Sequence, residues 1–78
     1  MSRRLATDAK IVLRRAGFEI HDANALGVKY FNATQPDFDF LHEDTTFVIN
    51  NGTVDNLQIV RLLNAVGFDE FGYKKRPA

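Results

Sequence analysis

Two stretches of this 78-residue sequence end in the same way, and these ends constrain the fold more than any other feature. Each follows apolar residues at helical spacing, and the two endings are Ala16-Gly17-Phe18-Glu19 and Val66-Gly67-Phe68-Asp69. A glycine directly after a helix takes the left-handed conformation, and an apolar residue after it folds back onto the last turn. The sequence therefore predicts two helices, one over residues 3–16 with Ser2 as its N-cap, and one that begins at Thr53 or Asp55.

The region between these helices is rich in aromatic and β-branched residues. Alternating patterns predict strands at residues 18–21, 28–33 and 46–50, and a further strand or extended segment around Phe38 and Phe40. Turn residues at 22–24 and Gly27 separate the first two strands. Short connections favour hairpins, so we expect an α+β fold: helix, three- or four-stranded antiparallel meander, helix, in two layers with both helices on one face of the sheet.

The size and composition indicate a single small domain over residues 1–78, in which residues 69–78 form a loosely ordered charged tail. Apolar residues make up 45% and charged residues 26%, as in an ordinary water-soluble protein. The chain has no cysteine, and no apolar run is long enough to span a bilayer. We expect a cytoplasmic protein without disulfides and without a membrane partner.

The charges are balanced overall but unevenly distributed. Ten basic and ten acidic residues give a formal net charge of zero, yet five of the first fifteen residues are basic. A basic row on the first helix and the basic tail could follow a phosphate backbone, with Tyr73 stacking on a base. This candidate nucleic-acid surface comprises Arg3, Lys10, Arg14, Tyr73, Lys74, Lys75 and Arg76. The alternative is a solvated helix face with a solubilising tail.

The most unusual segment interleaves four acids with two phenylalanines. Aromatic anchors among carboxylates suit docking on a basic protein surface, such as a nucleic-acid-binding groove that the segment would imitate. The alternative is that both rings belong to the core and that the outward acids keep an edge strand soluble. The candidate partner-binding residues are Asp37, Phe38, Asp39, Phe40, Glu43 and Asp44.

The sequence offers no catalytic set. His21 and His42 are the only histidines, each beside an acid, but their spacing fits no compact metal-ligand or acid–base motif. Ser2 is the only serine, and the five glycines are too scattered for a phosphate-binding loop. We therefore predict no catalytic residue, no metal, no cofactor and no enzymatic activity.

The order of elements resembles the double-stranded-RNA-binding-like fold of the HicA family of mRNA interferase toxins. The resemblance covers residues 5–67 and rests on the two glycine-terminated helices and on Val48-Ile49-Asn50 before a glycine-containing turn. The family's Gly-Ser-His step carries RNA cleavage, but here only Gly27 matches, and Val28 and Lys29 follow it. The resemblance implies the fold without the nuclease activity.

These observations predict a small non-enzymatic binding or regulatory protein that docks on a partner protein, of the kind common among small phage and bacterial regulators, including phage-type inhibitors of host nucleic-acid machinery. The alternatives are an RNA- or DNA-binding module and a degenerate HicA-like RNase. The sequence leaves a homodimer open and does not specify its register.

Overall fold

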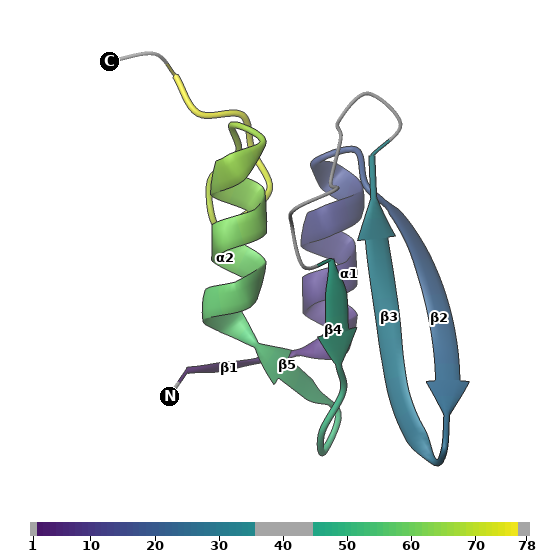
Figure 1. Ribbon diagram of the computed structural model, residues 1–78. Coiled ribbons are helices and arrows are strands. Elements are labelled where there is room, and N and C mark those ends of the chain that lie inside the picture. Colours follow the sequence, from purple (N-terminus) through teal and green to yellow (C-terminus); the bar gives the residue numbers. More distant parts are fainter. Residues whose placement is uncertain (1, 36–44, 77–78) are drawn as a thin grey trace.

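The computed structural model describes residues 2–35 and 45–76 (Figure 1). Along the chain, the elements are β1 (Arg3–Leu5), α1 (Ala6–Arg15), β2 (Glu19–Ala25), β3 (Val28–Thr34), β4 (Thr46–Val48), β5 (Thr53–Asp55) and α2 (Asn56–Ala65). The protein is thus α+β, as the sequence predicts. Neither helix is long and apolar enough to cross a membrane.

The strands form two antiparallel sheets, so the prediction of a single sheet was wrong. One is the meander β2-β3-β4, in which Phe31 of β3 lies opposite Asp22 of β2 and Phe47 of β4. The other joins β1 to β5, with Arg4 opposite Val54. The second sheet exists because the first residues of the chain are extended rather than helical.

Both helices end as the sequence predicts. In α1 the amide of Gly17 donates to the carbonyl of Arg14 at 3.0 Å, and that of Phe18 donates to Leu13 at 3.0 Å. The corresponding bonds after α2 are Gly67 to Asn64 at 3.1 Å and Phe68 to Leu63 at 2.8 Å. This pair of bonds defines a Schellman motif, and the two glycines have φ of 92° and 88°.

The predicted start of the first helix was wrong. Residues 3–5 form β1, and Leu5 has φ −57° and ψ 133°, outside the helical range. The guanidinium of Arg3 donates to the hydroxyl and the carbonyl of Thr53 at 3.1 and 2.9 Å. Pairing with a strand distant in sequence therefore overrides the local helical pattern, and Ser2 is not the cap.

The β2-β3 hairpin is longer than predicted. Residues 22–24 continue β2 instead of forming a turn, and the chain reverses at Leu26-Gly27, between the paired residues Ala25 and Val28. Leu26 and Gly27 have φ of 52° and 78°. Positive φ at both central residues identifies a type I′ turn, whose twist matches that of the strands.

Asn51-Gly52 also closes a tight turn. Asn50 and Thr53 exchange two backbone hydrogen bonds across it, at 2.8 and 3.0 Å, and the strand β5 follows. Asp55 then caps α2, because its carboxylate accepts a hydrogen bond from the amide of Leu57 at 2.9 Å. Of the two predicted caps, Asp55 is confirmed, whereas Thr53 belongs to a strand.

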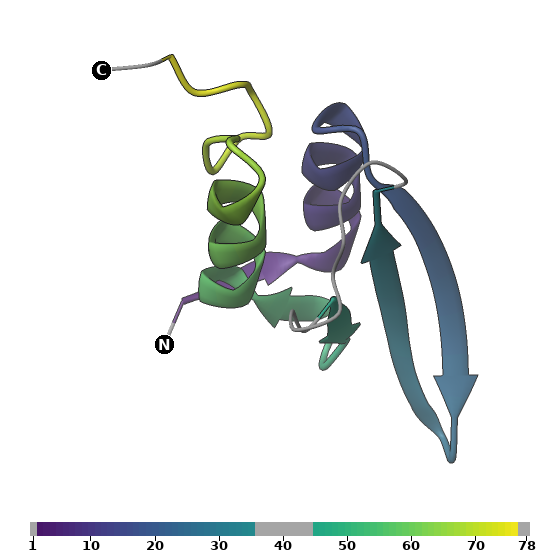
Figure 2. The ribbon, with the colours of Figure 1, turned by 45° about the horizontal axis from the view of Figure 1, so that its top comes forward.

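The core lies between the meander and the helices, which run side by side in Figures 1 and 2 and contact each other. The rings of Phe31 and Phe47 stack with centroids 5.1 Å apart. The largest fully buried side chains come from both helices and three strands: Phe31, Phe47, Leu13, Ile59, Leu63 and Val54. The far end of the β2-β3 hairpin extends beyond this core (Figures 1 and 2).

After α2 the chain folds back against the helix ends. Phe68 and Lys74 form an isolated bridge, and the amide of Lys75 donates to the carbonyl of Gly67 at 3.0 Å. Gly72 is buried, and a Cβ atom there would lie 2.3 Å from the carbonyl oxygen of Val12. The first part of the predicted charged tail, as far as Lys75, thus forms a hydrogen-bonded loop against α1.

Candidate functional site

The outer face of the β2-β3-β4 sheet is left uncovered by the described helices and strands. Side chains alternate across a sheet, and Phe31, Ala33 and Phe47 point into the core. Their neighbours therefore point outward, and no described helix or strand covers them. We call this surface the open face; it comprises Glu19, His21, Ala23 and Ala25 of β2, Val28, Tyr30, Asn32 and Thr34 of β3, and Thr46 and Val48 of β4.

The strand register arranges these side chains in rows. The central row is Ala23, Tyr30 and Val48, because Tyr30 pairs with Ala23 on one side and with Val48 on the other. Val48 is 51% exposed, and Tyr30 is half-buried between its neighbours. A small residue on one side of the ring and a β-branched one on the other give the open face an aromatic centre.

A polar row lies beside this apolar one. The hydroxyl of Thr46 donates to the amide oxygen of Asn32 at 2.7 Å. His21 lies in the same row, 3.4 Å from the hydroxyl of Thr34 and 3.9 Å from the carboxylate of Glu19. These mutual contacts hold the polar side chains in place, so they form a defined rim.

The open face carries no lysine or arginine in the described strands. Its only formal charge, apart from a protonated histidine, is that of Glu19. Nucleic-acid surfaces are strongly positive, whereas the centre of a protein interface is poor in charge and rich in aromatic residues. The open face has the low charge and the aromatic centre that are typical of protein interfaces, and it lacks the positive charge of a nucleic-acid surface.

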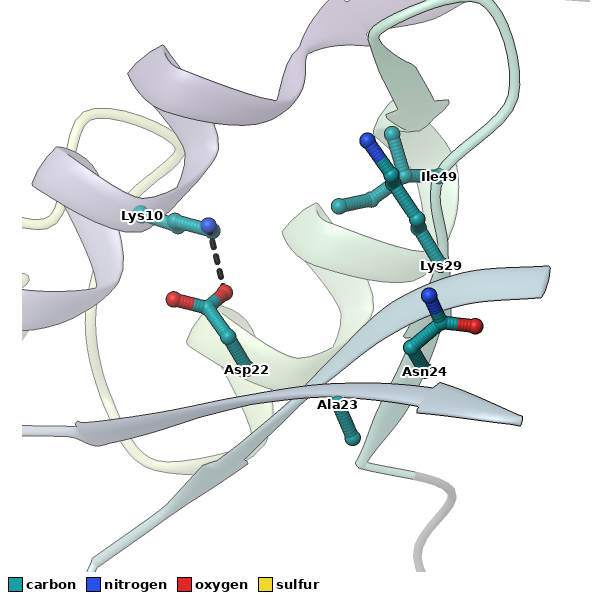
Figure 3. Close-up of a pocket in the computed structure, with 6 residues that line it drawn as sticks. All are labelled: Lys10, Asp22, Ala23, Asn24, Lys29 and Ile49. Atoms are coloured by element: carbon teal, nitrogen blue, oxygen red, sulfur yellow. Dashed lines mark ion pairs between the residues drawn. The ribbon is translucent and has the colours of Figure 1, made fainter. Parts of the chain in front are cut away.

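The other side of the β2-β3 hairpin, which faces α1, carries charged side chains. Beyond the core, an open pocket of about 480 Å³ is lined by Lys10, Asp22, Ala23, Asn24, Lys29 and Ile49. Figure 3 shows the side chains of Lys10 and Asp22 facing each other across it, with an ion pair of 2.5 Å between them. Lys10 also lies 5.5 Å from the centre of the Phe31 ring. The pocket thus places paired charges against apolar groups.

The predicted nucleic-acid surface is divided by the fold. Arg3 lies in β1 against Thr53, and Lys10 is bound to Asp22 with only 19% of its side chain exposed. Arg3, Lys10 and Arg14 therefore do not form one basic row on a helix, because the row assumed that the helix begins at Arg3. Arg14 is exposed in the last turn of α1.

The fold does bring the other half of that surface together. The guanidinium of Arg15 lies 4.6 Å from the centre of the Tyr73 ring and donates to the carbonyl of Phe71 at 2.7 Å. Lys74, Lys75 and Arg76 follow Tyr73 and are exposed. Arg15, which the sequence prediction omitted, is therefore the residue that connects the tail to α1.

The predicted acidic docking segment lies outside the described residues, since Asp37, Phe38, Asp39, Phe40, Glu43 and Asp44 all fall within 36–44. Its four acids still count in the net charge of the chain. All ten basic residues but only six of the ten acids fall in residues 2–35 and 45–76, which therefore carry a formal charge of +4. The net charge of zero therefore results from a positive charge on residues 2–35 and 45–76 and an equal negative charge on residues 36–44.

His21 is exposed beside Glu19 and Thr34, and His42 lies outside the described part of the chain. Within that part, no three His, Asp or Glu side chains are grouped as metal ligands.

Sequence reasoning did not identify Tyr30 or the open face. The signal was present, because residues 28–34 alternate between outward Val28, Tyr30 and Asn32 and inward Phe31 and Ala33. The pattern could not decide which side a helix would cover. That choice became visible only in the structure, where Lys10 of α1 lies over the Phe31 ring and Tyr30 is on the opposite side of the sheet.

Comparisons with known proteins give no relative: no family model, no curated protein and no solved structure matches this chain. The HicA resemblance therefore stays a prediction, and the functional argument depends on the geometry of the open face.

Proposed function

We propose that this chain is a small non-enzymatic binding protein that docks on a partner protein through the open face. The observation that carries the proposal is Tyr30 at the centre of a three-strand surface that has a polar rim and lacks lysine and arginine among its described residues. Tyrosine is enriched among the residues that dominate binding energy, and lysine is depleted at interface centres.

The distribution of polarity supports the same function. Val48 and Val28 are 51% and 45% exposed, and they flank the ring on neighbouring positions. Docking would remove this apolar area from water, at roughly 25 cal/mol per Å². The hydrogen-bonded rim of Asn32 and Thr46 would orient the partner, because those groups are already fixed.

A pair of matched variants tests the proposal. Val48→Lys places a charge on the open face, and Leu57→Lys makes the same kind of change on α2, at a side chain of similar exposure, 51% against 53%. Each variant and the wild type is immobilised, and the retained proteins are identified and quantified by mass spectrometry. We expect the wild type and Leu57→Lys to retain the same partner and Val48→Lys to retain at least tenfold less.

The purified partner then allows a direct measurement. Tyr30→Ala should raise the dissociation constant at least tenfold, since truncation of a central aromatic residue costs about 2 kcal/mol or more. Equal affinity of the wild type, Tyr30→Ala and Val48→Lys would refute docking through the open face. The narrower prediction, a phage-type inhibitor of host nucleic-acid machinery that uses the acidic segment, stays a prediction.

A second candidate function has one specific observation in its favour. The contact between Arg15 and Tyr73 joins α1 to the basic tail, which gives a cation, an aromatic ring and three further charges on consecutive residues. Such a combination can bind single-stranded nucleic acid through phosphate contacts and base stacking. We propose this function as the alternative to protein docking.

Salt dependence separates the two functions. Binding of a fluorescent oligonucleotide by three phosphate contacts should weaken about 20- to 40-fold between roughly 50 and 200 mM salt. Replacement of Lys74, Lys75 and Arg76 by alanine should abolish that binding, whereas the control Arg61→Ala on α2 should not. This alternative is excluded if the oligonucleotide does not bind, or if its binding changes neither with salt nor with replacement of the tail residues.

A further inference from the structure

The strand β2 forms an edge of the meander over its full seven residues. Its backbone orientation follows from the bonds on the other side of β3, where Lys29 accepts from the amide of Ile49 at 2.9 Å and Ala33 donates to Thr45 at 3.1 Å. The backbone groups of Lys29 and Ala33 therefore face β4. In an antiparallel pair, the residues opposite them on β2 must face away from β3.

The residues that face outward are Asn24, opposite Lys29, and Ile20, opposite Ala33, together with Asp22 between them. Each presents an amide and a carbonyl toward the free side of β2, where no described strand lies. We call these three residues the β2 edge. A row of backbone groups of this kind is a template for a further strand.

Several of the usual protections of an edge are absent from residues 19–25, and the charge of Asp22 on the core side is paired with Lys10. The segment has no proline, lysine or arginine, and its register with β3 runs without a bulge from Glu19 to Ala25. The opposite edge differs, because β4 has three residues and its Thr46 carbonyl accepts a hydrogen bond from the side chain of Gln58 at 2.7 Å. The sheet is therefore open to extension at β2.

We propose that a second copy of this chain pairs antiparallel with β2 about a two-fold axis at Ala23, which makes one six-stranded sheet. An axis perpendicular to the sheet keeps both open faces on the same side, so each residue meets one on the same face. An axis at Asp22 would place two like charges directly opposite, which is unfavourable. Moving the axis to Ala23 places Asp22 opposite Asn24 of the second copy.

This register also makes the charges complementary. Asn24 is the neighbour of Lys29 in the hairpin, so each row of the joined sheet contains Asp22 of one copy and then Asn24 and Lys29 of the other. Figure 3 shows that Asp22, Asn24 and Lys29 lie on one side of the hairpin and that the side chain of Ala23 points to the other. Two small alanine side chains then meet at the axis on the open face.

The pairing also gives the exposed leucine at the tip of the hairpin an apolar neighbour. Leu26, which is fully exposed in the single chain, comes beside Ile20 of the second copy. The two pairs of Asp22 and Asn24 would exchange roughly four backbone hydrogen bonds. The pairing is made by backbone groups of the β2 edge, with Ala23 as its one open-face contact, so it does not depend on the proposed docking function.

Charged residues introduced at Ala23, on the two-fold axis, test this arrangement. Ala23→Lys and Ala23→Glu each place two like charges opposite one another, whereas an equal mixture of the two places opposite charges there. By light scattering after gel filtration, we expect the wild type to have the mass of two chains and each variant that of one. The mixture should return to the mass of two chains.

Two further variants test whether loss of the dimer could result from misfolding. Asn24→Pro removes an amide that faces away from β3, so it should prevent pairing and leave the circular dichroism spectrum unchanged, whereas Asn24→Ala should preserve the dimer. Val48→Lys should also preserve it, which separates this inference from docking on the open face. A monomeric wild type at sub-millimolar concentration, or a mixture that stays monomeric, overturns the proposal.

Discussion

The two hairpins of this protein are closed by turns of the same type, but they are built differently. In both turns, two residues of positive φ lie between residues that pair antiparallel: Leu26-Gly27, with φ of 52° and 78°, between Ala25 and Val28, and Asn51-Gly52, with φ of 53° and 72°, between Asn50 and Thr53. Asparagine is among the residues that tolerate this conformation best, whereas leucine pays a penalty of about 1–2 kcal/mol there. The leucine side chain is, in addition, fully exposed to water.

The two turns also differ in how they are attached to α1. The carbonyl of Gly52 accepts a backbone hydrogen bond from Ala6 at 2.9 Å, so the second turn is fixed to the start of α1. The distal part of the first hairpin is linked to α1 by the side-chain pair of Lys10 and Asp22. The second turn is thus held by a backbone hydrogen bond and has a favourable residue at positive φ, whereas the first turn has an exposed leucine in that conformation and is linked to α1 through side chains farther along the hairpin.

The largest difference should appear between the buried middle and the exposed first residue of β3. Phe31 is fully buried, so Phe31→Ala should lower the free energy of unfolding by about 3–5 kcal/mol. Val28 lies on the same strand beside the exposed turn, and Val28→Ala should change it by less than about 0.5 kcal/mol. Urea unfolding followed by circular dichroism measures both. Equal losses would show that the distal hairpin is as tightly packed as the core.

Substitutions at the first residue of each turn should change the free energy of unfolding by a smaller amount, and in opposite directions in the two hairpins. Leu26→Asn should stabilise the protein by about 1 kcal/mol, and Asn51→Leu should destabilise it by a similar amount, because only the preference for positive φ changes. Thermal unfolding of both variants at low concentration tests this. A destabilising Leu26→Asn in a monomeric sample would mean that the leucine packs within its own chain.

Local patterns predicted the parts of the fold that depend on neighbours in sequence. The two Schellman motifs after Ala16 and Val66 and the Asp55 cap involve residues at most five positions apart, so their residue types suffice to specify them. The strand at residues 3–5 was missed because its partner lies about fifty residues away. Helical periodicity that continues into Leu5 cannot reveal such a partner.

The candidate site was predicted less well for a related reason. Alternation along β3 identifies two faces of the strand, but only the packing of α1 determines that Tyr30 stays outside. The predicted basic row placed Arg3 on the helix of Lys10, but Arg3 lies in β1, and Asp22 of β2 binds Lys10. Arg15 was missed because its contact with Tyr73 again joins distant segments.

The smallest expected effect concerns the ion pair that links the first hairpin to α1. Asp22→Asn should lower the free energy of unfolding by about 0.5 kcal/mol, because the Asp22 side chain is 64% exposed and an exposed pair contributes little. The same variant should speed amide hydrogen exchange in residues 24–29 while leaving β5 unchanged, since the Ala6–Gly52 bond holds the second turn independently. The stability difference from the wild type should shrink in high salt, as expected for a partly exposed pair. A uniform increase of exchange over both hairpins would instead show that they open as one unit, and that the contrast between their turns is confined to the backbone at Leu26 and Asn51.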